Sequence, residues 1–219
     1  MTGSESWDCL LALAGGYLLG SIPASFLIAK AFGVDIRTVG SGNVGATNVL
    51  RALGPKAGVP ALVFDALKGT CAVWLARALV PSGGPLGPIA FPLLCGVMAV
   101  LGHSFTIWLR FKGGKGVATG AGMFAALAPA PLGLAVAVFL AVLAATRYVS
   151  LASMVSAVSL NVFIAVLMPG AAVPLIAIAL PLALFICWRH RANIQRLRDG
   201  TEPKVGKGAV PVTAPESVS

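Results

Sequence analysis

Charged residues are scarce in this sequence, and acidic residues are the scarcest of all. Of its 219 residues only 11% are charged, with 7 acidic and 16 basic side chains, whereas 58% are apolar. Apolar stretches run almost without interruption from residue 10 to residue 188. A soluble domain of this length needs many more polar residues. The composition therefore excludes a soluble globular protein and predicts an integral membrane protein with one domain.

Two familiar kinds of site motif are also missing. The cysteines are scattered through apolar segments without any C-x-x-C spacing, so we expect small buried side chains rather than metal ligands. The phosphate-binding pattern G-x-x-x-x-G-K-[ST] is absent as well. We therefore expect no metal site, no cofactor and no P-loop.

Seven apolar segments, separated by glycine- and proline-rich breaks, are predicted to be transmembrane helices of an all-α bundle. A helix that crosses the hydrocarbon core needs about 20 residues, or fewer if it is re-entrant. The fourth and fifth segments are short, which leaves a tilted pair or a single re-entrant hairpin open. The first lacks the basic flank of a cleaved signal peptide, so we interpret it as a helix. The predicted helices cover residues 7–32, 58–80, 89–109, 117–128, 132–145, 150–168 and 173–190.

The distribution of basic residues predicts the orientation of this bundle. With seven crossings and an external N-terminus, every Lys and Arg except Arg77 falls at or near the inner face. Basic residues favour the cytoplasmic side, so the C-terminus is expected to be cytoplasmic. After residue 200 the chain turns polar and proline-rich. We therefore expect a membrane domain over residues 1–200 and a disordered cytoplasmic tail over 201–219.

A run of glycines and small polar residues over positions 40–51 has the composition of a binding loop for phosphate. Glycines let backbone N–H groups turn toward phosphate oxygens, hydroxyl and amide side chains add donors, and Arg51 adds a fixed charge. A loop that only connects two helices does not need all three of these features. The candidate binding residues are Ser41, Gly42, Asn43, Gly45, Thr47, Asn48 and Arg51.

A second glycine-rich stretch, K-G-G-K-G at residues 112–116, lies on the same predicted face. It precedes a predicted helix N-terminus, whose dipole would also attract an anion. By itself the stretch is equally typical of a basic turn at the membrane edge. Its candidate binding residues are Gly113, Gly114, Lys115 and Gly116.

Two further pairs of polar residues share a helix face at i, i+3 spacing. Ser150 and Ser153 form one pair, and His190 and Asn193 form the other. Serines in helices also bond to their own backbone carbonyls, so neither serine is singled out. The neighbouring basic residues have a simpler explanation, which is the binding of anionic lipid. They are Arg147, Arg191, Arg196 and Arg198.

Three ionisable residues fall inside predicted helices, where an unpaired charge is costly. Asp65 and Lys68 form an i, i+3 pair that could close the bundle as an ion pair or contact a substrate. His103 could bond between helices or transfer a proton. Both alternatives stay open for each residue.

Taken in order, these segments resemble one family over nearly the whole chain. The motifs are G-S-I-P-A-S-F at 20–26, G-S-G-N-V-G-A-T-N-V-L-R at 40–51, D-A-L-K-G at 65–69, G-H-S-F at 102–105, F-K-G-G-K-G-V-A-T at 111–119, R-Y-V-S-L-A-S-M at 147–154 and H-R-A-N-I-Q-R-L-R-D-G-T-E at 190–202. They are similar to the bacterial acyl-phosphate-dependent glycerol-3-phosphate acyltransferases, the PlsY family.

The resemblance implies a seven-helix enzyme of the bacterial cytoplasmic membrane with its active site facing the cytoplasm. It would transfer a fatty acyl group from acyl phosphate to the 1-hydroxyl of glycerol 3-phosphate, giving lysophosphatidic acid and phosphate in phospholipid synthesis. The H-x-x-x-x-D dyad of acyl-CoA-dependent acyltransferases is absent, because Trp108 and Gln195 stand five residues after the two histidines. We therefore expect an electrostatic clamp, in which a substrate phosphate oxygen accepts the proton.

Site roles follow from the matched motifs. The resemblance implies that the loop at 40–51 binds acyl phosphate and that Lys115, Ser150 or Ser153, His190 and Asn193 contact glycerol 3-phosphate. The residues expected to be catalytic are Ser41, Arg51, Lys115, His190 and Asn193. Glu202 could orient a basic residue or be a solvated charge of the tail.

The expected partners are the two substrates and membrane lipid, with no nucleic acid, and contact with the enzyme that makes acyl phosphate is left open. A rival hypothesis is a transporter or channel for a phosphate-containing anion. Its polar residues should line a path through the membrane midplane, whereas here they gather at one end.

Overall fold

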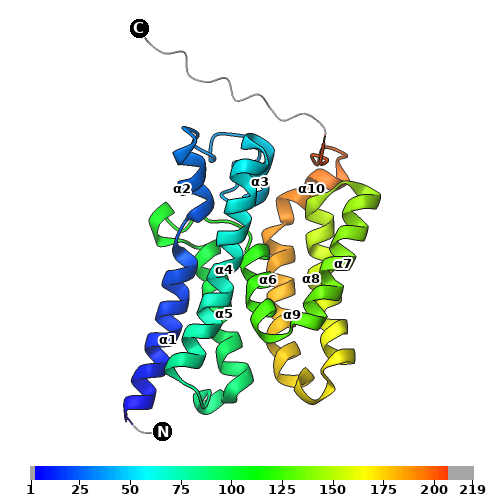
Figure 1. The fold of residues 1–219 in the computed structure, drawn as a ribbon. Helices are drawn as coiled ribbons and strands as arrows, with labels where there is room; N and C mark the ends of the chain where they lie inside the picture. The colour runs from blue at the N-terminus through cyan, green and yellow to red at the C-terminus, as the bar shows by residue number, and fades with distance from the viewer. Residues whose placement is uncertain (1–2, 207–219) are drawn as a thin grey trace.

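The computed structural model describes residues 3–206, and every regular element within that range is helical (Figure 1). Three short 3-10 helices, at Gly84–Leu86, Ile107–Leu109 and Pro169–Ala171, connect the longer elements. The α-helices are α1 Gly3–Ser21, α2 Ala24–Ala31, α3 Ala46–Leu53, α4 Pro55–Leu79, α5 Gly87–Ser104, α6 Val117–Leu127, α7 Pro129–Thr146, α8 Val149–Leu167, α9 Ala172–Arg189 and α10 Arg191–Arg198.

The apolar helices confirm the prediction of a membrane-embedded helical bundle. Six segments are long and apolar enough to cross a bilayer, and they contain α1 with α2, α4, α5, α7, α8 and α9. Helix α6 is apolar but has only 11 residues, too few to cross the hydrocarbon core alone. The predicted seventh crossing depends on this short helix.

The predicted first helix over 7–32 is wrong in one respect, because the helix is interrupted between α1 and α2. Pro23 has no backbone N–H to continue the helix, and the Ala24 N–H instead donates to the Ile22 carbonyl at 2.9 Å. The Ser21 carbonyl accepts the Thr106 hydroxyl at 2.5 Å. The break therefore ties the end of α1 to the segment after α5.

Two short helices lie outside the seven predicted transmembrane helices. Gly45 has an extended backbone and caps a helix, so the second half of the run at 40–51 belongs to α3. The sequence after His190 forms α10. Helix α7 is longer than predicted because Pro129 and Pro131, interpreted as breakers, lie in its first turn, where the missing N–H groups have no intrahelical partner to lose.

Helix α6 packs against α4 with almost no side chains between their backbones. A Cβ added at Gly69 of α4 would lie 1.9 Å from the Thr119 carbonyl oxygen, and one added at Gly122 of α6 would lie 1.8 Å from that of Ala66. Small residues let membrane helices approach this closely. Glycine is therefore required at both positions, and the contact fixes α6 inside the bundle.

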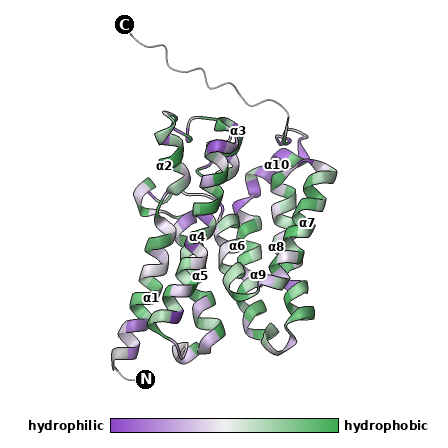
Figure 2. Ribbon diagram, viewed as in Figure 1, coloured by the Kyte–Doolittle hydropathy of each residue, from purple (hydrophilic) through white to green (hydrophobic). Residues whose placement is uncertain are grey.

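The two ends of the bundle differ in polarity. Helix α1 begins at one end, whereas α2, α3 and α10 lie at the other (Figure 1). Hydrophilic residues concentrate on α3 and α10 at that second end (Figure 2). Part of the tail expected to be disordered is described there, up to residue 206, and residues 207–219 lie outside the described range.

Candidate active site

A cavity of about 390 Å³ opens between the polar end of the bundle and its apolar interior. Its polar end combines the glycine run with side chains from α8, α9 and α10. Its apolar part is lined by α6, α7, α8 and α9, with residues that include Phe124, Leu132, Phe139, Leu140, Leu160 and Leu182. One cavity thus combines a charged end with an apolar part, which we call the apolar slot.

The Asn48 side chain organises the loop that precedes α3. Its amide nitrogen donates to the carbonyls of Ile36, Val39 and Asn43 at 3.1, 2.9 and 3.1 Å, and its oxygen accepts the Ser41 N–H at 3.2 Å. Both N–H donors of the Asn48 amide are therefore used within the protein. Asn48 borders the cavity, but as the residue that shapes the loop.

Most of the remaining candidates from the run reach the cavity. Ser41, Asn43, Gly45 and Thr47 line it. Gly42 does not, because its N–H donates to the Val39 carbonyl at 3.1 Å and its φ of +65° belongs to a tight turn. The loop therefore presents side chains and selected backbone groups to the cavity rather than a continuous ring of amides.

Arg51 also lines the cavity. Its Nη2 donates to the Pro203 carbonyl at 3.2 Å, whereas its buried Nε has no partner among the described residues. Burial lowers the pKa of this guanidinium, partly offset by the negative charge of Glu202. Arg51 therefore retains donors that an anion could use.

The Gly113 and Gly114 backbones are engaged by the protein itself. Their N–H groups donate to the Ser104 and His103 carbonyls, each at 3.1 Å. Their carbonyls accept Arg189 Nη2 at 3.1 and 2.6 Å. Neither glycine lines the large cavity, whereas Lys115 and Gly116 do. The two glycines thus position Lys115 and leave no free amide for an anion.

Lys115 is a partly buried cation that lines the polar end of the cavity. Its Nζ donates to Asn193 Oδ1 at 2.5 Å. Burial lowers the pKa of Lys115 to about 8, with the charge of Glu202 opposing this shift and nearby arginines adding to it. At neutral pH Lys115 is still mainly charged, so it can attract a phosphate.

Glu202 is the hub of the polar end, although its role was left open by the sequence. Its Oε1 accepts Ser150 Oγ and Asn193 Nδ2, each at 2.7 Å, and its Oε2 accepts Arg196 Nε at 2.8 Å. Burial alone would raise the pKa of this carboxyl, but the hydrogen bonds and the Arg196 charge outweigh it and lower the pKa. Only 4% of the residue is exposed, so it is not a solvated tail charge.

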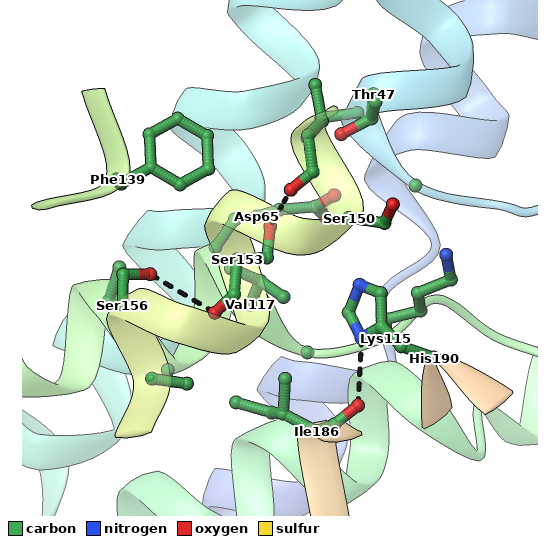
Figure 3. Close-up of a pocket in the computed structure, with 18 of the residues that line it drawn as sticks. Thr47, Asp65, Lys115, Val117, Phe139, Ser150, Ser153, Ser156, Ile186 and His190 are labelled. Atoms are coloured by element: carbon green, nitrogen blue, oxygen red, sulfur yellow. Dashed lines mark hydrogen bonds between the residues drawn. The ribbon is translucent and has the colours of Figure 1, made fainter. Parts of the chain in front are cut away.

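The two candidate serines differ in their partners, although both line the cavity. Ser150 is bonded to Glu202, whereas Ser153 Oγ donates to the Val149 carbonyl of its own helix at 2.8 Å. Figure 3 shows both on α8, with Lys115 and His190 on other elements around the same pocket. Of the two serines, Ser150 alone belongs to the Glu202 network.

His190 is oriented by a single backbone contact. Its Nδ1 lies 2.8 Å from the Ile186 carbonyl oxygen, which can only accept, so Nδ1 carries the proton and Nε2 is left as an acceptor (Figure 3). Burial, together with the positive charge of Lys115, lowers the pKa of His190 to about 4. The ring is therefore neutral at pH 7.

A second buried cluster lies beside the cavity. Asp65 accepts Lys68 Nζ at 2.5 Å and Ser25 Oγ at 2.7 Å, and His103 Nδ1 lies 3.5 Å from it. The structure thus contains the Asp65–Lys68 ion pair, which was one of the two alternatives left open by the sequence. Asp65 and His103 also border the large cavity, so a role toward substrate stays a prediction. Within residues 3–206, no three His, Cys, Asp or Glu side chains are grouped so that they could hold a metal ion.

Comparison with known proteins assigns this arrangement to one family. A family model described as glycerol-3-phosphate acyltransferase matches residues 10–200. A glycerol-3-phosphate acyltransferase of Thermus thermophilus is 46% identical over 203 residues, covering 93% of this chain and 96% of that protein. The Geotalea daltonii enzyme of the same name is 45% identical, with 88% and 95% of the two chains covered.

Solved structures give the same answer. A crystal structure of PlsY, an integral membrane glycerol 3-phosphate acyltransferase in its glycerol 3-phosphate form, superposes with a TM-score of 0.82 at 40% identity, covering 90% of this chain and 96% of that one. Its lysophosphatidic acid form gives a TM-score of 0.80 at 39% identity, with 90% and 95% covered. The chain therefore belongs to the glycerol-3-phosphate acyltransferase family of integral membrane acyltransferases, the PlsY family.

Proposed function

We propose that this acyltransferase moves a fatty acyl group from acyl phosphate to the 1-hydroxyl of glycerol 3-phosphate. The bond between the acyl carbon and the phosphate oxygen breaks, a bond to the glycerol oxygen forms, and the products are lysophosphatidic acid and inorganic phosphate. The observation that carries this proposal is the continuity of one cavity from the Lys115 end to the apolar slot. An acyl phosphate has the same two parts, an anionic head and an apolar chain.

The polar end suits two phosphate groups. It is lined by two groups of residues, Arg51 with side chains of the glycine run, and Lys115 with His190 and Asn193. Cations attract the phosphate oxygens, while neutral donors orient them. We assign the first group to acyl phosphate and the second to glycerol 3-phosphate, with Ser150 as the serine of the second group.

The apolar slot suits the acyl chain. Apolar side chains from α6, α7, α8 and α9 line it, in the same cavity as the polar end. Because the fatty chain comes from apolar lipid rather than from water, the slot contributes close packing and a fixed position more than hydrophobic transfer energy. The bound acyl chain would thereby hold the reactive carbonyl at a fixed position next to the polar end of the cavity.

Catalysis in this proposal comes from positioning and charge. Acyl phosphate is a mixed anhydride with a good leaving group, and alignment of the attacking hydroxyl can supply about 7 to 11 kcal/mol in favourable cases. A phosphate oxygen of a substrate accepts the hydroxyl proton. Because the 1-hydroxyl gives its one hydrogen to the phosphate oxygen, His190 Nε2, a neutral acceptor, orients the substrate through its 2-hydroxyl, and Arg51 and Lys115 stabilise the charge that moves to the phosphate.

The proposed topology has seven crossings, with the N-terminus outside and the C-terminus in the cytoplasm of a bacterium. Two observations support it. Helices α1 and α10 lie at opposite ends of the bundle, and the helices at the α10 end carry Lys30, Arg51 and Arg196 (Figure 1). Basic residues favour the cytoplasmic side. The site would then face the cytoplasm, where a water-soluble substrate and an enzyme that supplies acyl phosphate can reach it.

The test is an assay of purified protein in detergent with hexadecanoyl phosphate and radiolabelled glycerol 3-phosphate. We expect labelled lysophosphatidic acid and free phosphate in equal amounts, and no product when hexadecanoyl-CoA replaces the acyl phosphate. Phosphate release without labelled lipid would make the protein a hydrolase and overturn the proposal. Uptake of glycerol 3-phosphate by sealed proteoliposomes without turnover would instead support the transport hypothesis.

A further inference from the structure

Arg147 occupies a backbone position that does not favour arginine. It follows the last residue of α7 with a φ of +64°, in the left-handed region where helices usually place Gly or Asn. An arginine at such a position suggests that its side chain has a task of its own. From the sequence alone it has only the general role of binding anionic lipid.

The side chain and backbone of Arg147 both hold Val205. The guanidinium donates to the Val205 carbonyl through Nε at 3.0 Å and through Nη2 at 2.7 Å. In return the Val205 N–H donates to the Arg147 carbonyl at 2.9 Å. We call this two-way connection between Arg147 and Val205 the clasp.

The clasp closes one end of a short segment, residues 201–206, which we call the strap. The other end is fixed by α10, where the Thr201 and Glu202 N–H groups donate to the Arg196 carbonyl at 2.8 and 3.1 Å. Between the two ends, the Pro203 carbonyl accepts Arg51 Nη2. The strap thus connects α10 with α3 and with the turn between α7 and α8.

Glu202 depends on the strap for its position, because it belongs to no helix. Its carboxylate nevertheless holds Ser150 and Asn193, and the Asn193 oxygen in turn accepts the Lys115 ammonium. A strap that is free at one end would let this carboxylate leave its place. The polar end of the cavity would then lose the partner that fixes two of its side chains.

We propose that Arg147 is a positioning residue that holds Glu202 in the site by clasping Val205. This inference rests on the proposed acyl transfer, in which Asn193 and Lys115 bind the glycerol 3-phosphate. Arg147 itself touches neither substrate, and its effect passes through the strap.

The first experiment measures the clasp without using activity. Hydrogen exchange followed by mass spectrometry is compared in the wild type, Arg147→Ala, Arg147→Lys and Arg198→Ala. Arg198 is a matched control, because it is an exposed arginine at the same end of the bundle. We expect faster exchange in strap peptides of Arg147→Ala, a smaller increase in Arg147→Lys, and no change in Arg198→Ala.

The second experiment measures the consequence for turnover. We expect Arg147→Ala to lower kcat/KM for glycerol 3-phosphate about tenfold, the scale of losing one hydrogen bond to a charged group. The Tm should stay close to that of the wild type, and Arg147→Lys should recover part of the loss. Val205→Pro removes the N–H on the other side of the clasp, so the double variant should be no worse than the poorer single variant.

Four results would overturn the inference. The first three are unchanged exchange in the strap, additive losses in the Arg147→Ala and Val205→Pro double variant, and a defect that appears only in vesicles containing phosphatidylglycerol, which would mean lipid binding. The fourth is faster exchange with unchanged kinetics, which would leave a clasp without a positioning role. If the wild type is inactive in the acyl-transfer assay, the proposed function is rejected. The exchange experiment still tests whether Arg147 holds the strap, because it does not depend on activity.

Discussion

Lys115 Nζ donates to Asn193 Oδ1 at 2.5 Å, although the two residues stand 78 positions apart. The bond connects the segment before α6 with α10. Its acceptor is a neutral amide, and the nearest carboxylate of the network, that of Glu202, is bonded to the other end of the same amide. Lys115 is thus held in place without being neutralised by a direct ion pair. Its charge remains available to a phosphate.

The first prediction concerns pH. Because the pKa of Lys115 is lowered to about 8, its charged fraction falls once the pH rises above that value. We expect kcat/KM, which reports the free enzyme, to fall about tenfold per pH unit above pH 8. In the complex a bound phosphate favours the charged form, so the fall in kcat should begin at a higher pH.

The measurement is a pH profile of initial rates between about pH 6 and pH 10, with Arg51 left intact as a cation that does not titrate in this range. Lys115→Arg, even if slow, should lack the alkaline fall because arginine stays charged. An identical alkaline fall in this variant would assign the titration to another group.

The second prediction separates the two serines. Ser150→Ala removes a hydroxyl bonded to the buried Glu202 carboxylate, so we expect kcat/KM to fall about tenfold or more. Ser153→Ala removes only a bond to the carbonyl of its own helix, and we expect a change below about threefold. Steady-state kinetics of both variants measure the difference, and a larger defect in Ser153→Ala would reverse the assignment.

The sequence alone does not predict that Ser150 matters more than Ser153, because both serines lie on the same helix face. The break between α1 and α2 was missed, but the sequence pattern was sufficient for the six apolar segments that are long enough to cross a membrane, because long apolar runs have few alternatives. It was also sufficient to bring the loop at 40–51, Lys115 and His190 to one end of the bundle. Helix faces and charge do not reveal which hydroxyl meets a carboxylate 52 residues later.

Glu202 shows the same limit more sharply. It lies past the last predicted helix in a polar, proline-containing stretch, which by composition is a tail. Its position depends on the clasp at Arg147 and on side-chain donors from two separate helices, α8 and α10. Such contacts are properties of the folded chain. The one available signal was a carboxylate at the end of a strongly basic segment, three residues after Asp199.

The third prediction concerns Gly113, which places Lys115. A Cβ at this position would lie 2.0 Å from the His103 carbonyl oxygen, a backbone atom that cannot move away easily. We expect Gly113→Ala to displace the segment and to lower kcat on the order of 100-fold, the scale of a 1 Å misplacement, while the protein still inserts and folds. Gly133→Ala is the matched control, since its Cβ would meet nothing within 4 Å. Equal activity in the two variants would contradict the close packing.

The last prediction decides whether Asp65 is structural. In Asp65→Asn, the buried Lys68 loses its carboxylate partner, and removing one member of a buried ion pair costs about 3 to 5 kcal/mol. We expect a clearly lower Tm. Removing both charges in Asp65→Asn with Lys68→Met should restore much of the Tm, because no charge is then left uncompensated. If the pair only supports the bundle, acyl transfer should return together with stability. A stable double variant without activity would show instead that Asp65 acts on the substrate, as its place beside the cavity permits.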